Sequence, residues 1–176
     1  MPSVEELEQT IESLEKRLRC VEDITSIERL KAQYGRLTDS RYDRNGVVER
    51  ALLEPLAREI SELFCEDAVW EGGKALGVCR GRDQIYQRFL EPTLQFSWHY
   101  FVKPEITVEG DRARGRWDIL APCTTREGRP LWMAGYEDDE YVRVDGDWLH
   151  RSMKLSVVFM APYERGWAKT SAPVTR

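Results

Sequence analysis

Residues 131–149 read LWMAGYEDDEYVRVDGDWL, and this stretch decides the fold class. The pair Asp145–Gly146 separates two runs rich in aromatic and β-branched residues, a pattern typical of a tight two-residue hairpin. Two further turn signals lie upstream, EGD at 109–111 and REG at 126–128. The spacing therefore predicts four consecutive strands joined as an antiparallel meander, over residues 98–108, 112–123, 131–144 and 148–160.

Upstream of the meander, apolar residues recur at helical spacing. At the N-terminus they alternate at intervals of three and four, which makes a heptad seam of about three heptads. The seam residues are Val4, Leu7, Ile11, Leu14, Leu18 and Val21. A helix with so narrow and short a seam is marginal on its own. We therefore expect it to pack on a neighbouring element or on a partner subunit.

A second apolar stripe follows and includes Ile27, Leu30, Tyr34 and Leu37. Thr25 and Glu28 fit a capping box in front of this stripe. The pattern predicts that the first helix ends or bends near Asp23, and that a second helix runs to about Asp39.

The segment between this helix and the meander is mixed. Residues 41–46 (RYDRNG) predict a loop, and residues 48–64 predict a helix that Pro55 splits or kinks. A short strand at 68–71, a glycine-rich loop through Gly81 and a short helix at 85–90 come next. Helices first and a meander afterwards indicate an α+β fold with helices on one sheet face. We divide the chain into an N-terminal helix (1–23), an α+β domain (24–165) and a loose tail (166–176).

Composition excludes several classes of protein. The chain has 176 residues, of which 41% are hydrophobic, so it fits one globular domain. A net charge of −5 argues against nucleic acid as the main partner, and the apolar runs are too short for a bilayer helix. The N-terminus lacks the apolar core of a signal peptide. Four scattered cysteines favour reduced thiols in a cytoplasmic protein: Cys20, Cys65, Cys79 and Cys123.

A series of motifs follows in a fixed order between residues 24 and 150. They are Ile27-x-x-Leu30-Lys31-x-x-Tyr34-x-x-x-x-Asp39, Leu63-Phe64-x-Glu66-Asp67-Ala68-Val69-Trp70, Gly81-Arg82-Asp83-x-Ile85, Ser97-x-His99-x-x-x-x-Pro104-Glu105-Ile106-Thr107, Gly115-Arg116-Trp117 and Tyr136-x-Asp138-x-x-x-x-Arg143-x-Asp145-Gly146-x-Trp148. In this order they resemble the SnoaL-like branch of the nuclear transport factor 2 superfamily. The resemblance implies a cone-shaped half-barrel of the cystatin-like type. In that fold a curved, mostly antiparallel sheet carries N-terminal helices on its concave side and encloses a pocket.

Within that family the chain most resembles bile acid 7α-dehydratases, and more distantly scytalone dehydratase and a hexachlorocyclohexane dehydrochlorinase. The resemblance implies a catalytic pair of His99 and Asp39, with Tyr34 as a third functional residue. A further acid of the bile acid enzymes falls at Ala121 here, which argues against a bile acid substrate.

The chemistry of these residue types fits acid–base work. Imidazole can remove a proton next to a carbonyl and return it to a leaving group, and a carboxylate can orient it. On a straight helix Asp39 falls away from the apolar stripe, so it faces inward only if the helix ends or unwinds around Thr38. Tyr34 lies on the stripe, where it either donates to a substrate oxygen or is an ordinary core tyrosine.

The remaining candidates divide between pocket and scaffold. We place Trp70, Trp98 and Trp117 at an apolar substrate pocket. The acid run 138–140 predicts a solvated face rather than a metal site, and His150 a structural position. Neither a metal nor a cofactor is expected.

The leading hypothesis is a cofactor-independent lyase (dehydratase) or isomerase that acts on an apolar hydroxylated or ketonic small molecule. A polyketide-type cyclase would use the same acid–base pair. The alternative is a non-catalytic ligand-binding or assembly subunit, resembling the β subunit of an aromatic-ring dioxygenase. We expect a homodimer or homotrimer, because the outer face of such a sheet needs covering.

Overall fold

The helices and strands of the computed structural model, which describes residues 2–166 and residue 169, follow the predicted order with several short additions. The helices are α1 (Val4–Asp39), α2 (Arg50–Glu62), α3 (Gly73–Leu76) and α4 (Arg82–Leu90). The strands are β1 (Tyr42–Asp43), β2 (Gly46–Val47), β3 (Phe64–Glu71), β4 (Val78–Arg80), β5 (Leu94–Ser97), β6 (Tyr100–Glu109), β7 (Arg112–Thr125), β8 (Pro130–Val144) and β9 (Asp147–Pro162). Among these residues no helix is long and apolar enough to cross a membrane. The predicted loose tail lies outside the described residues, apart from 166 and 169.

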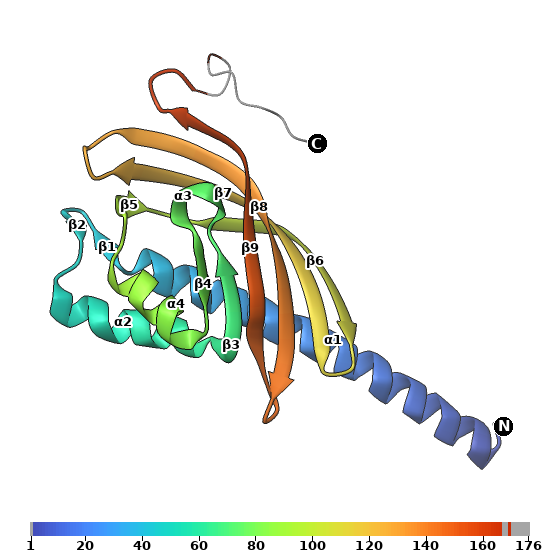
Figure 1. Cartoon of the computed structure of the whole chain (residues 1–176). Helices are drawn as coiled ribbons and strands as arrows, with labels where there is room; N and C mark the ends of the chain where they lie inside the picture. Colours follow the sequence, from blue (N-terminus) through green and yellow to red (C-terminus); the bar gives the residue numbers. More distant parts are fainter. Residues whose placement is uncertain (1, 167–168, 170–176) are drawn as a thin grey trace.

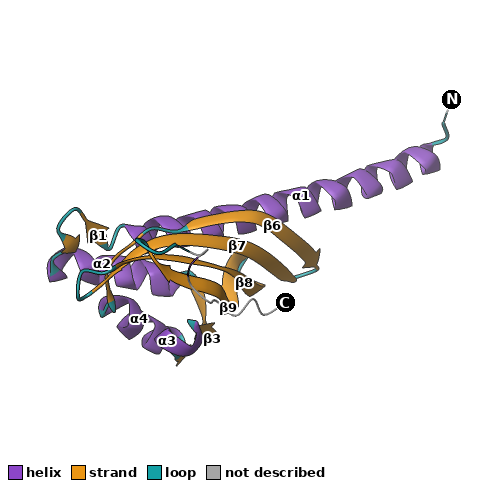
Figure 2. Cartoon of the chain, turned by 90° about the horizontal axis from the view of Figure 1, so that it is seen from above, coloured by secondary structure: helices purple, strands orange, loops and turns teal. Residues whose placement is uncertain are grey.

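The main sheet is curved and mostly antiparallel. Its strand order is β4-β3-β9-β8-β7-β5, with β6 also paired to β7. Strands β6 to β9 form the predicted meander, whereas β3 runs parallel to β9. The β8–β9 turn has positive φ at both Asp145 (52°) and Gly146 (96°), as a tight hairpin of this twist requires. Helix α1 passes along the sheet, and its N-terminal half projects well beyond it (Figure 1, Figure 2).

Helix α1 is continuous, so the predicted break near Asp23 is wrong. The capping box lies instead at the start of the helix, where the Glu6 N–H donates to Ser3 Oγ at 3.2 Å and the Ser3 N–H donates to the Glu6 carboxylate at 2.7 Å. The Thr25 hydroxyl donates to the Val21 carbonyl at 2.9 Å, one turn earlier in the same helix. A threonine can satisfy its hydroxyl this way inside a helix, so the local motif did not mark a helix start.

Two other local predictions also differ from the structure. Helix α2 continues through Pro55, since one missing N–H bond does not end a helix whose Leu53, Ala57 and Ile60 are buried. The predicted 41–46 loop contains the short hairpin of β1 and β2, and the glycine-rich loop contains α3 and β4.

The interior has two apolar clusters. The larger joins α1, α2 and α4 to β3, β8 and β9, with Ile27, Phe64 and Ile85 fully buried. The smaller lies on the inner face of the meander and consists of Ile119, Ala121 and Met133, with Phe101 and Leu155 packed against it.

Candidate active site

Asp39 and His99 meet where the end of α1 lies beside the start of β6. His99 Nδ1 is 2.6 Å from Asp39 Oδ1. The backbone N–H of His99 also lies 3.1 Å and 3.2 Å from the two oxygens of the same carboxylate. Both side chains are largely buried, at 17% exposure for His99 and 8% for Asp39. The imidazole is therefore held in one orientation while part of its ring stays accessible.

This contact determines which ring nitrogen carries the proton. An ionised carboxylate only accepts hydrogen bonds, so the neutral His99 donates from Nδ1. Nε2 then keeps its lone pair and can take a proton from another molecule. The carboxylate would also stabilise the imidazolium that forms.

The end of α1 turns Asp39 inward, as the sequence requires for a functional role. Asp39 is the last residue of the helix. The buried Arg41 donates from Nε to the Thr38 carbonyl at 3.0 Å and from Nη1 to the Phe89 carbonyl at 3.3 Å. Burial lowers the pKa of the Arg41 guanidinium, and nearby negative charge at Asp39 opposes that shift. A cation at a helix C-terminus also complements the helix dipole. Arg41 thus fixes the turn that directs Asp39 inward. Only a loop was predicted from the sequence at 41–46, with no such role for Arg41.

Tyr34 lies in the same region but is deeper. The Trp70 indole N–H donates to the Tyr34 hydroxyl at 3.2 Å, and Tyr34 is 4% exposed. Burial raises the pKa of Tyr34, and the charge of Glu137 adds to this, so the phenol stays protonated. The Tyr34 ring packs against Phe101 at a centroid distance of 6.1 Å, and Phe101 separately stacks on His99.

The three predicted pocket tryptophans do not lie together. Trp70 contacts Tyr34, and Trp117 is buried with its N–H donating to Tyr141 at 3.0 Å. Trp98 is 47% exposed, although it directly precedes His99. The tryptophans therefore do not form a single wall beside the dyad.

An apolar wall that was not predicted from the sequence lies beside the His99–Asp39 pair. The Phe101 ring is nearly parallel to the His99 imidazole, with centroids 5.9 Å apart and an angle of 7°. Phe101 is paired with Ile119 across β6 and β7, and Ala121 with Met133 across β7 and β8. Every second residue of β7 from 117 to 123 is apolar and buried, and this alternation was the available signal.

A buried polar cluster lies between α1 and β8. The Lys31 ammonium donates to Asp139 Oδ2 at 2.7 Å and also to Glu137, and it lies 4.4 Å from the centre of the Phe101 ring. Tyr141 donates to Asp139 at 2.8 Å. Phe101 therefore contacts both the Lys31 cluster and His99.

Burial and neighbouring charges shift the pKa values of the groups in and beside this cluster. Burial lowers the pKa of Lys31, but the two carboxylates outweigh it and raise the pKa above its ordinary value. Burial raises the pKa of Asp139 to about 6. The pKa of the fully buried His150 is well below its usual range because burial disfavours the cation and Lys31 repels it. His150 is therefore a neutral ring stacked on Phe64, as its predicted structural position suggests.

The predicted solvated acid run is wrong for its middle residue. Asp138 and Glu140 are exposed, whereas Asp139 is buried because it points to the opposite face of the strand. The sequence did contain one sign of the buried cluster: Lys31, a charged residue, falls on the buried stripe of α1 between Ile27 and Tyr34. Within the described residues no group of three or more His, Cys, Asp or Glu side chains is arranged to hold a metal ion.

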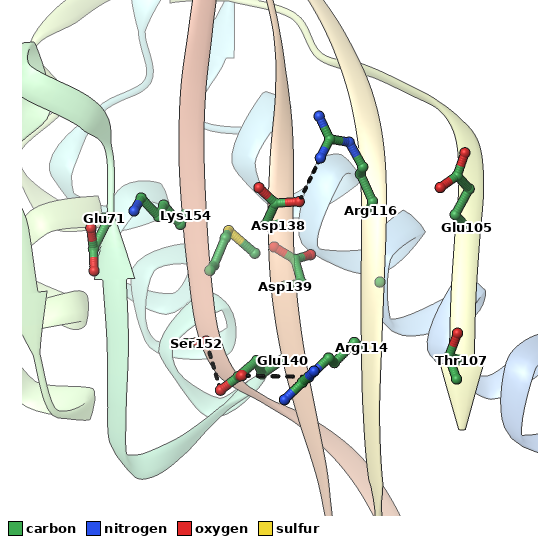
Figure 3. Close-up of a pocket in the computed structure, with 12 residues that line it drawn as sticks. Glu71, Glu105, Thr107, Arg114, Arg116, Asp138, Asp139, Glu140, Ser152 and Lys154 are labelled. Carbon is green, nitrogen blue, oxygen red and sulfur yellow. Dashed lines mark hydrogen bonds and ion pairs between the residues drawn. The ribbon is translucent and has the colours of Figure 1, made fainter. Parts of the chain in front are cut away.

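A depression of about 400 Å³ lies on the outer face of the sheet, away from α1 (Figure 3). Its lining is charged and internally paired, with Arg116 3.3 Å from Asp138 and Arg114 3.8 Å from Glu140. Neither residue of the dyad lines it. This depression is therefore distinct from the predicted apolar pocket on the concave side.

Comparison with known proteins agrees with this architecture. A protein-family model described as a SnoaL-like domain matches residues 19–154. No curated protein sequence matches the chain significantly.

Three solved structures illustrate the likeness in fold. A proposed scytalone dehydratase from Novosphingobium aromaticivorans is 21% identical, with 81% of this chain and 89% of that chain covered and a TM-score of 0.66. A hexachlorocyclohexane dehydrochlorinase, LinA type 2, is 18% identical, with 90% and 99% covered and a TM-score of 0.68. An NTF2-like protein with a cystatin-like fold, also from N. aromaticivorans, is 23% identical, with 82% and 88% covered and a TM-score of 0.64. The predicted cystatin-like α+β fold is confirmed.

Proposed function

The chain belongs to the SnoaL-like domain family, and from this and the His99–Asp39 contact we propose that it is a lyase or isomerase that needs no cofactor. Its substrate is a small apolar molecule that carries a hydroxyl or ketone group. The observation that carries the proposal is the 2.6 Å contact beside an apolar wall. An oriented base next to apolar side chains suits proton removal from a carbon acid.

In the proposed dehydration, Nε2 of His99 takes a proton from the carbon next to the substrate carbonyl. The electron pair of that C–H bond forms the new double bond as the bond to the hydroxyl breaks. The imidazolium returns its proton to the departing hydroxide, which leaves as water. In an isomerisation, the same proton returns to a different carbon. Asp39 stabilises the imidazolium in either case, and Tyr34 donates to the substrate oxygen on which charge develops.

The test uses a panel of hydroxylated cyclic ketones, with loss of water followed by mass spectrometry and isomerisation by NMR. The variants His99→Gln and Asp39→Asn keep the approximate shape of each side chain but remove the base and the charge. We expect each to lower kcat by at least about 100-fold, while Tyr100→Phe, at an exposed position next to His99, stays close to wild type. Unchanged turnover of a genuine substrate in both dyad variants would rule out this mechanism.

The proposal also covers the cellular location and the assembly state of the enzyme. The four cysteines are free thiols, which supports a reducing, cytoplasmic location. We propose a homo-oligomer, dimer or trimer, as its assembly state. The competing class, a non-catalytic assembly subunit, would reveal itself by co-purifying with a larger iron-containing subunit and by showing no turnover on the panel.

A further inference from the structure

The N-terminal half of α1 projects from the domain (Figure 1), and its apolar seam is exposed. The side chains of the seam are between 48% and 72% exposed: Val4, Leu7, Ile11, Leu14, Leu18 and Val21. All residues from 2 to 22 are exposed, so no described part of this chain covers the seam. A contiguous row of large apolar side chains in water indicates an interaction surface.

The seam and the domain lie on opposite sides of α1. The first residues of the helix that are buried in the domain are Asp23, Ile27 and Leu30. At 3.6 residues per turn, the mean direction of the seam is roughly half a turn away from the direction of these residues. Two chains can therefore bring their seams together while both domains stay on the outside of the pair.

We propose that the seam binds the same seam of a second copy of this chain, in a parallel two-stranded coiled coil. Val4, Ile11 and Leu18 occupy a positions, and Leu7, Leu14 and Val21 occupy d positions. The first two of the three heptads have a β-branched residue at a and leucine at d, the combination that favours two strands over three or four in parallel coiled coils. The occupant is therefore a second copy rather than two further copies.

The charges beside the seam select the parallel orientation. Glutamates fill the e positions, at Glu8, Glu15 and Glu22, and Arg17 fills a g position. In a parallel pair the g position of one helix faces the following e position of the other, which sets Arg17 against Glu22 of the second copy. In an antiparallel pair the e rows would face each other, glutamate against glutamate. The parallel pair thus gains two attractive contacts by symmetry and avoids a row of repulsive ones.

The helix is already formed before it pairs, which lowers the cost of association. At its start, Ser3 and Glu6 form the capping box. Where it enters the domain, Asp23 accepts from Arg143 at 2.6 Å and from the Trp148 N–H at 3.2 Å. A short isolated helix would have to nucleate, but this one extends a segment held by the core. About three heptads can then suffice.

Site-specific cross-linking of the full-length chain tests the partner and the orientation together. In a Cys20→Ser background, Leu7→Cys places a thiol in the seam near its N-terminal end. Under mild oxidation we expect a covalent dimer, because a parallel pair sets residue 7 against residue 7. The control Gln9→Cys points away from the seam and should stay monomeric on a denaturing gel. Failure of Leu7→Cys to cross-link overturns the proposal. So does cross-linking of a Leu7→Cys chain to a Leu18→Cys chain in its place.

Sedimentation equilibrium supplies a second readout that does not depend on oxidation. We expect Leu14→Asp to raise the dimer dissociation constant at least tenfold, because it puts two carboxylates into the seam. The control Lys16→Asp, on the far side of the helix, should leave it within twofold. Both positions are exposed, so neither change threatens the fold of the domain. Equal dissociation constants for Leu14→Asp and wild type would overturn the proposal.

Discussion

Replacing Lys31 by methionine should be among the most damaging changes in the molecule, although Lys31 lies outside the proposed dyad. The lysine side chain is 1% exposed, and its two partners, Glu137 and Asp139, are 6% and 0% exposed. Methionine has a similar volume, so the loss is mainly of charge. Breaking a buried ion pair by removing one partner costs about 3–5 kcal/mol. For a domain of this size that corresponds to a fall in Tm of roughly 6–20 °C.

The pH dependence of this loss gives a sharper test than its size. The lysine cation holds the pKa of Asp139 down against burial, so Lys31→Met raises that pKa above its wild-type value of about 6. The folded variant then binds more protons than folded wild type, and its deficit shrinks as the pH falls from 7 to 5.

Urea titrations at both pH values provide the assay. The triple variant Lys31→Met, Glu137→Gln, Asp139→Asn removes all three charges and should recover much of the lost stability. Lys16→Met, on the exposed helix, is the matched control and should change stability by less than about 0.5 kcal/mol. A Lys31→Met deficit below about 1 kcal/mol that is equal at pH 5 and pH 7 would refute the reasoning.

Further predictions concern other parts of the molecule. His150→Leu should make stability fall less steeply below pH 7. In wild type His150 alone contributes a loss of about 1.2 kcal/mol between pH 7 and pH 5.5, because the unfolded histidine binds a proton below its pKa of 6.5 and the buried one does not. An equal slope in both proteins, measured by urea titration, would contradict this. Phe101→Ala should lower stability by about 1.5–3 kcal/mol, because Phe101 is only partly buried. It should also raise KM for an apolar substrate more than it lowers kcat, as steady-state kinetics would show. Deleting residues 1–20 should weaken self-association. An unchanged dissociation constant in sedimentation equilibrium would contradict that. Trp98→Ser should lower the Tm by about 2–6 °C, because only about half of the Trp98 side chain is buried.

The meander was predictable because its information is local. Asp145–Gly146 specifies one turn geometry, and the flanking runs have a period of two, so the order of the strands follows without knowledge of the rest of the chain. The full register does not, because the β8–β9 pairing shifts at Ala134–Gly135 and again at Glu140–Tyr141. The helix break was predicted wrongly for a related reason. The hydroxyl of Thr25 can form a hydrogen bond either as a helix cap or within a helix, as it does here with the Val21 carbonyl. The contact of Asp23 with Arg143, which holds this part of α1 against the domain, is long-range and cannot be read from the local motif.

The candidate site was only partly readable from the residues. His99 and Asp39 are 60 positions apart, and periodicity carries no information about contacts at that separation. Their pairing was expected from the family resemblance alone. The partners of Lys31 lie more than 100 positions away, and an acid run gives no sign of which carboxylate turns inward until the strand is paired. Long-range partners of polar groups depend on strand register and helix placement, which emerge only with the fold.

In the proposed mechanism, Asp39 holds His99 as a neutral base with its lone pair on Nε2. Long-range ¹H–¹⁵N NMR of the imidazole reports directly which ring nitrogen is protonated. At a pH where His99 is neutral, we expect a protonated Nδ1 and an unprotonated Nε2 in wild type, and a mixture of tautomers in Asp39→Asn. A wild-type imidazole protonated at Nε2 would contradict the account, because the nitrogen that faces the substrate would then have no lone pair to accept a proton.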